Sequence, residues 1–155
     1  MAQLRRCLAA LLLISACGFD PQTPPTDKTS MESWLKEKPW AAWACEPDVH
    51  PSRNGSPHGP NRICSNAKLS GNTDGAYPAG AATVKELWKS DGSLAGHSVM
   101  RKVTTGRSGA GWYFFETFDG RVYADGNDST ACTGCHARAG SGGMPGKDFV
   151  FTQVD

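Results

Sequence analysis

The stretch between residues 81 and 123 alternates apolar and polar side chains, and short turn sequences interrupt it. A period of two is typical of strands, because successive side chains point to opposite faces of a sheet. Asp91-Gly92 and Asp119-Gly120 are hairpin signals between such runs. Neighbouring strands joined by tight turns predict an antiparallel meander. The expected strands are 81–88, 97–104 and 111–118, with a short piece at 121–123.

Short elements are expected on either side of this meander. Thr29 and Glu32 form a capping box that predicts a helix over 30–38, ended by Pro39. Extended pieces are expected at 61–65 and 148–153. Trp34, Trp40 and Trp43 are expected to cover one end of the core.

Glycine and proline limit the fold class. The chain has 18 glycines and 10 prolines, which argue against a helical bundle because both residues interrupt helices. We therefore expect a mainly β (α+β) fold, an antiparallel sheet of about five strands with short helices. One of these helices carries the C-terminal C-x-x-C-H motif, Cys132 to His136, and Ser129 or Thr130 can cap it.

Length and charge limit the domains and partners. The 155 residues suffice for one domain of ordinary size, and 16 basic residues balance 15 acidic ones. This balance provides no basic field, so nucleic acid is not an expected partner.

Residues 1–16 have the pattern of a bacterial export signal. Two arginines precede the apolar run Leu8 to Ile14, which is too short to span a bilayer as a helix. The run closes on Ser15-Ala16-Cys17, which looks like a lipobox, so cleavage before Cys17 and lipidation of its sulfur are expected. The alternative is an ordinary signal with Cys17 incidental. We expect an exported domain over 29–155 that a tether at 17–28 anchors to a bacterial membrane, facing the periplasm or cell surface.

The six cysteines can be assigned by position and compartment. Cys7 leaves with the signal, and Cys17 takes the lipid. Export places the chain in an oxidising compartment, where Cys45 and Cys64 are expected to form a disulfide. The alternative is a pair of free, buried thiols.

The other two cysteines stand in Cys132-Thr133-Gly134-Cys135-His136, the spacing at which c-type haem is attached. On one helical turn the two thiols match the two vinyl groups of the ring, and the next residue can place its imidazole under the iron. We expect one covalent haem c on Cys132 and Cys135, with His136 as axial ligand. A thioredoxin-like pair or half of a zinc site is the alternative, but the first lacks a β-α-β setting and the second lacks another ligand pair.

The position of this motif narrows the class of haem protein. Only 19 residues follow His136, whereas small electron-transfer cytochromes carry the motif near the amino terminus and a methionine ligand far downstream. Met144 is too close to His136, and the strand pattern does not fit the helical cytochromes c′. An open iron site is favoured.

Several pieces in order resemble the cytochrome P-460 family, which includes the β-sheet cytochromes c′. The resemblance covers about residues 58 to 155, and nothing matches 34–54. It implies a mainly antiparallel β fold with the haem against the sheet and a five-coordinate iron with an open distal side. The matching pieces are His58-Gly59 with Arg62, then 77–87, 98–102, 111–115, the haem motif and 148–152.

Members of this family either oxidise hydroxylamine or bind nitric oxide and similar ligands. In the enzymes a lysine is cross-linked to the haem ring, and Lys85 occupies the matching position. A lysine in an apolar pocket is the better nucleophile, because burial disfavours its ammonium form. The alternative is a solvent-facing lysine on a strand.

The distal side of the iron is less well defined. The enzymes place a carboxylate above the iron, and this sequence has no acid in register. The distal pocket candidates are Arg62, His97 and Glu116. Surface positions are the alternative for Arg62 and His97.

Together these features predict a c-type haem protein with an open distal site, for hydroxylamine oxidation or nitric oxide binding and detoxification at the cell envelope. If the protein is an enzyme, it is a haem oxidoreductase acting on hydroxylamine or nitrogen oxides. Expected partners are a small nitrogenous ligand, a redox partner protein and the membrane, and a homodimer is left open. The alternative is an electron-transfer cytochrome with six-coordinate haem, for which Met100, Met144 or His97 would supply the sixth ligand. A gas or redox sensor is a third reading, without a visible output module.

Overall fold

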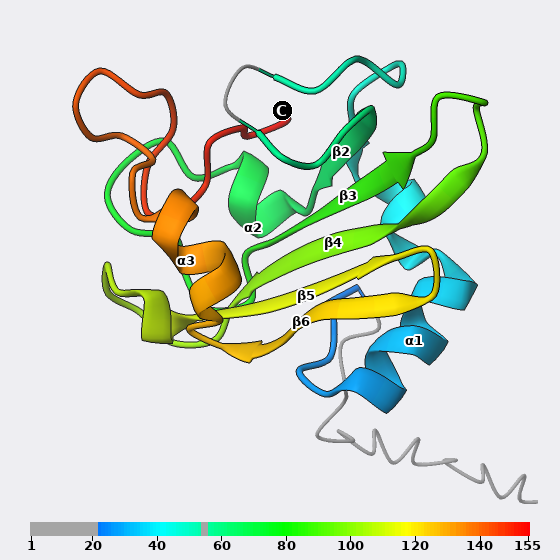
Figure 1. Cartoon of the computed structure of the whole chain (residues 1–155). Coiled ribbons are helices and arrows are strands. Elements are labelled where there is room, and N and C mark those ends of the chain that lie inside the picture. The colour runs from blue at the N-terminus through cyan, green and yellow to red at the C-terminus, as the bar shows by residue number, and fades with distance from the viewer. Residues whose placement is uncertain (1–21, 54–55) are drawn as a thin grey trace, which may run out of the picture.

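The computed structural model describes residues 22–53 and 56–155 as a β-sheet with short helices (Figure 1). The expected signal at 1–16 and lipidation site Cys17 lie outside the described residues, as does the start of the tether. Within the described ranges no helix is long and apolar enough to cross a membrane.

Six strands form one sheet in which each strand pairs antiparallel with its neighbour in sequence. The predicted mainly β meander with short helices is therefore confirmed. The strands are β1 (Ala44–Cys45), β2 (Asn61–Ser65), β3 (Ala82–Trp88), β4 (Leu94–Lys102), β5 (Trp112–Phe118) and β6 (Arg121–Asn127).

Two strands are longer at one end than the sequence predicts. β4 begins three residues before the expected start, and β6 continues to Asn127 instead of ending at Tyr123. β4 begins at Leu94, and position 96 requires glycine because β5 passes close by. A Cβ at Gly96 would stand 1.9 Å from the carbonyl oxygen of Thr117.

The expected closing strand at 148–153 is wrong. Only an isolated bridge between Lys147 and Val150 forms there. Asp148 and Phe149, between the bridged residues, have φ of 41° and 70°. Extended strands need negative φ, so this segment turns back on itself instead of joining the sheet.

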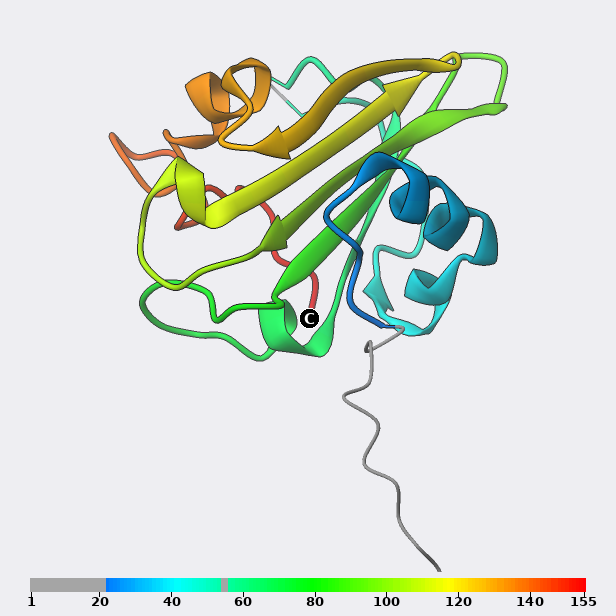
Figure 2. The same cartoon turned by 90° about the horizontal axis from the view of Figure 1, so that it is seen from below.

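The helices cover both faces of the sheet. Seen from below, α1 (Lys28–Glu37) and the 3₁₀ helix η1 (Pro39–Ala42) lie on one side, and α3 (Thr130–His136) lies on the other (Figure 2). The short helix α2 (Ala67–Ser70) follows β2. η2 (Gly109–Gly111) is a single 3₁₀ turn before β5.

α1 begins two residues before the predicted start, because Asp27 rather than the Thr29–Glu32 box caps it. The carboxylate of Asp27 accepts a 2.9 Å hydrogen bond from the backbone N–H of Ser30. α3 begins after Ser129, whose side chain makes no capping hydrogen bond.

The sheet separates two apolar cores. On one face, the tryptophans expected to cover the core do so: Trp34 lies 5.2 Å from Trp40 and 5.8 Å from Trp43 between ring centroids. They pack with Val84, Val99 and Phe115 of the sheet. The second core lies on the α3 face and contains Leu69, Tyr77, Ala81, Met100, Trp112, Phe114, Ala124 and Val150.

Candidate functional site

A cavity of about 560 Å³ opens between the α3 face of the sheet and three other segments. These segments are α3 itself, the loop before β2 and the chain after α3. The volume lies in the range of sites for small ligands and cofactors. Cys132, Cys135 and His136 line one side, and side chains of β2, β3, β4 and β5 form the floor.

α3 presents both motif cysteines to this cavity. Their thiols are free and half-buried, three residues apart on one helical turn. Burial raises the pKa of the Cys132 thiol. The five-residue motif thus places two thiols and one imidazole on the wall of the same cavity.

His136 is held from one side of its ring. Its Nδ1 lies 2.7 Å from the carbonyl oxygen of Phe149, and since that oxygen can only accept, Nδ1 carries the proton. Burial lowers the pKa of His136 to about 4, against the opposing effect of this hydrogen bond. A neutral imidazole with a protonated Nδ1 keeps the lone pair of Nε2 for a metal. The rings of Phe114 and Phe151 lie 5.7 and 5.6 Å from the imidazole.

Lys85 lines the cavity from β3, together with Thr83, as their shared strand face predicts. Burial lowers the pKa of Lys85 to about 8, although the Glu116 carboxylate opposes this change. None of the salt bridges in the described part of the chain involves Lys85. An amine with such a pKa is uncharged in part of its population near neutral pH, which makes it nucleophilic.

Glu116 also lines the cavity, and it has a partner that sequence reasoning did not assign to the site. Nδ1 of His58 lies 3.1 Å from Oε2 of Glu116, and both side chains are largely buried. Burial alone would raise the pKa of Glu116, but His58, Ser98 and Lys85 outweigh it and hold the pKa below its usual value. The carboxylate is therefore ionised at neutral pH.

The loop that carries His58 is fastened to β2 by Glu46. Its carboxylate accepts a 2.8 Å hydrogen bond from the backbone N–H of Ile63, lies 3.0 Å from Nε2 of His50 and pairs with Arg53. Arg53 and His58 then line the cavity from this loop. The sequence indicates His58 only as part of a piece that resembles the family. A loop has no periodicity from which the direction of the His58 side chain could be predicted.

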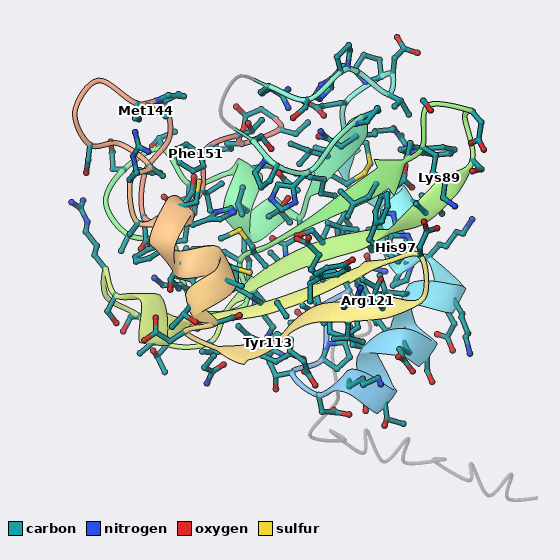
Figure 3. All side chains as sticks on the ribbon, in the orientation of Figure 1. Lys89, His97, Tyr113, Arg121, Met144 and Phe151 are labelled. Atoms are coloured by element: carbon teal, nitrogen blue, oxygen red, sulfur yellow. A yellow bond between two sulfur atoms is a disulfide. The ribbon has the colours of Figure 1, made fainter. Side chains whose placement is uncertain are left out.

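His97 is not at the cavity, contrary to expectation. It alternates with Ser98 and Met100 on β4, and Met100 is the cavity residue. The His97 ring instead lies 5.1 Å from the ring of Trp40, and burial lowers its pKa. Figure 3 shows His97 at the α1 end of the sheet, away from Met144 and Phe151.

Arg62 also faces away from the cavity. Asn61 and Ile63 line the cavity, so the side chain between them points to the opposite face of β2. There the Arg62 guanidinium donates to the backbone oxygen of Glu46 at 2.8 Å and lies 3.4 Å from Glu86. Arg62 therefore does not line the cavity, contrary to expectation.

The remaining cysteine assignment agrees with the structure. Cys45 and Cys64 form a disulfide between directly paired positions of β1 and β2. This bond lies on the α1 side, where Cys64 belongs to the packed core.

The residues around the cavity suit a covalent haem. The hydroxyl of Thr83 and the side-chain oxygen of Asn61 are buried at its wall and have no hydrogen-bond partner within the described residues. No group of three or more His, Cys, Asp or Glu side chains in 22–53 and 56–155 could hold a bare metal ion. Haem iron needs only one or two protein ligands, because the ring supplies the others.

Comparison with known proteins finds no matching family model and no matching curated protein.

Proposed function

We propose that this chain is an exported, lipid-anchored c-type haem protein whose cavity receives small nitrogen compounds. The observation that carries the proposal is the meeting of Cys132, Cys135 and His136 with Lys85 and Glu116 around one cavity. Cys132 and Cys135 would hold the ring through thioether bonds, and His136 would bind its iron through Nε2. The bound haem would supply one-electron chemistry and an iron that binds small ligands.

The polar groups of the cavity favour hydroxylamine as a substrate. Oxidising hydroxylamine removes protons as well as electrons, so a base near the substrate is required. Glu116 is ionised, so its carboxylate can accept a proton from a substrate in the cavity. The imidazole of His58, next to this carboxylate, is a second group that can take up a proton. Nitric oxide binding needs no such base, and only an accessible iron would be required for it.

Lys85 supports the resemblance to the cytochrome P-460 family. Its amine lines the cavity with Cys135 and His136, and its lowered pKa suits bond formation to the haem ring. We propose Lys85 as the cross-linking residue of the loaded protein: its amine nitrogen would replace a hydrogen on a ring carbon, and a two-electron oxidant such as a peroxide would take up the two electrons that are released with the two protons. A peptide map in which Lys85 is recovered on an unmodified peptide would reject the cross-link without affecting thioether attachment.

Replacing Glu116 tests the proposed reaction. In the haem-loaded protein we expect Glu116→Gln to lower hydroxylamine oxidation by about 10²- to 10⁴-fold, because the proton acceptor is lost, while nitric oxide still binds. The matched control is Glu86→Gln, since Glu86 is a largely buried carboxylate of the same sheet that faces Arg62 and Trp40 instead. Equal activity of Glu116→Gln and the wild type would remove Glu116 from the reaction.

An electron-transfer function remains the second candidate, and one distance favours it. The His58 ring lies 6.3 Å from the His136 ring between centroids, so a second imidazole lies near the one that would bind iron. Met100 and Met144 also line the cavity, whereas His97 does not. A low-spin spectrum that nitric oxide does not change, and that becomes high-spin in His58→Ala but not in His97→Ala, would establish this alternative.

A further inference from the structure

The carbonyl group that holds His136 belongs to a turn with an uncommon backbone. Lys147 and Val150 exchange two backbone hydrogen bonds of 2.9 and 2.8 Å, and Asp148 and Phe149 form the corner between them. Both corner residues have positive φ, 41° and 70°. Asparagine and glycine usually occupy such corners, and a phenylalanine adopts this backbone only where its surroundings impose it.

The carboxylate of Asp148 makes the contacts that impose this turn. It accepts hydrogen bonds from the Lys102 ammonium at 2.9 and 3.0 Å and from the backbone N–H of Tyr77 at 2.8 Å. The indole N–H of Trp112 donates to it at 3.4 Å. The side chains of Asp148 and Lys102 are both 0% exposed. Moving either partner of a fully buried ion pair away from the other leaves a buried charge uncompensated, which is energetically costly. The two side chains are therefore held in a narrow range of positions.

Lys102 in turn is fixed within the molecule. It is the last residue of β4, and its ammonium also donates to the carbonyl oxygen of Gly106. The same ammonium lies 4.8 Å from the centroid of the Trp112 ring. The turn at Asp148 is therefore attached to the sheet through Lys102 and Trp112.

The buried ion pair is connected to His136 through a single residue, Phe149. The carbonyl of Phe149 directly follows Asp148 and accepts the 2.7 Å hydrogen bond from Nδ1 of His136. A hydrogen bond at Nδ1 fixes the tautomer and ring orientation of a metal-binding histidine and raises its basicity as a ligand. The position of Asp148 thus determines how well this hydrogen bond is made.

We propose that Asp148 and Lys102 are positioning residues for His136. Their buried ion pair holds the turn that directs the Phe149 carbonyl at Nδ1, and it thereby sets how strongly the imidazole donates electrons to iron. The inference deepens the proposed function and rests on it, because electron donation matters only with iron bound.

The first test uses the haem-loaded full-length protein. Asp148→Ala combined with Lys102→Met removes both charges together, so no buried charge is left alone. We expect a midpoint potential shifted to more positive values and a lower iron–histidine stretching frequency, with both thioether bonds intact. The matched control is Asp125→Asn, which removes a carboxylate that Tyr113 contacts, and both readouts should stay at wild-type values. An unchanged potential and stretching frequency in the loaded double variant would overturn the proposal.

A second test does not depend on haem. Asp148→Asn combined with Lys102→Met keeps an acceptor for the Tyr77 N–H and leaves no buried charge alone, so the full-length chain is expected to fold. In haem-free protein with ¹⁵N-labelled histidine, NMR should show His136 only as the Nδ1–H tautomer in the wild type and as a mixture in this double variant. A single Nδ1–H tautomer in both proteins would overturn the role of Asp148. A wild type that takes up no haem would instead contradict the proposed function, and the NMR result would still decide whether Asp148 and Lys102 position His136.

Discussion

Lys85 illustrates how burial changes a side chain that sequence alone presents as an ordinary strand lysine. It lies in the wall of the cavity, where burial lowers its pKa to about 8. Below pH 8 the folded and unfolded chains both carry the proton, so the folded chain bears the whole cost of the buried charge. Between pH 8 and the usual pKa the unfolded chain alone keeps the proton, and stability rises with pH.

A substitution of Lys85 should therefore stabilise the haem-free chain in a pH-dependent manner. We expect Lys85→Met to raise the free energy of unfolding by about 3 kcal/mol at pH 7, because the buried ammonium is removed. The gain should disappear as the pH rises through 8 toward 10.5. Denaturant unfolding at several pH values measures it, with Lys89→Met as the exposed control. A gain that stays constant to high pH would show that charge burial is not the cause.

For residues on strands, the sequence predicts which side chains share a face of the sheet. It does not predict which face borders the cavity. Alternation along a strand puts Thr83 on the same face as Lys85 and His97 on the opposite face from Met100, and the cavity lining agrees with both. What alternation could not tell is which of the two faces borders the cavity, since both faces of this sheet are covered. For that reason His97 was expected in the pocket, although it packs on Trp40.

At the scale of elements, the disulfide attaches the short edge strand β1 to β2. β1 has only two residues, and Cys45 is directly paired with Cys64 of β2. The bond closes a loop with a sequence separation of 19 residues. The same segment carries the loop that brings His58 to the cavity, so the disulfide also limits the freedom of this wall.

Removing the disulfide should weaken folding measurably. We expect Cys45→Ala with Cys64→Ala to lower the free energy of unfolding by roughly 3 kcal/mol, chiefly because the unfolded chain gains freedom. Denaturant unfolding of the wild type with and without reductant should reproduce the difference. If reductant leaves the wild-type midpoint unchanged, the bond does not contribute to stability.

The segment after α3 shows why one element was mispredicted. Residues 148–152 combine apolar and polar side chains as a strand does, and nothing in their order indicates a turn. The turn arises because Asp148 binds Lys102 and Tyr77, which are 46 and 71 residues away in sequence. Local pattern does not contain such contacts, so an ion pair between distant residues overrides the strand preference.

In the whole molecule, the two faces of the sheet differ: one borders a packed core and the other borders the cavity. The α1 face is closely packed around Trp34 and Trp40, and the α3 face encloses the cavity. The meander could be predicted from the sequence, and so could the helix that carries Cys132 to His136, because both depend on local spacing. The wall formed by His58, Arg53 and Phe151 could not, because it assembles from loops that meet only in the folded chain.

The central claim is that α3 carries a covalent haem inside this cavity. Its most direct test is the intact mass of the protein expressed from its whole sequence, exported in a host that matures c-type cytochromes and then purified under denaturing conditions. The account predicts that the chain keeps the mass of one haem, and that the variant Cys132→Ala with Cys135→Ala lacks it. A wild-type chain without haem mass, with free thiols at Cys132 and Cys135, would contradict the account.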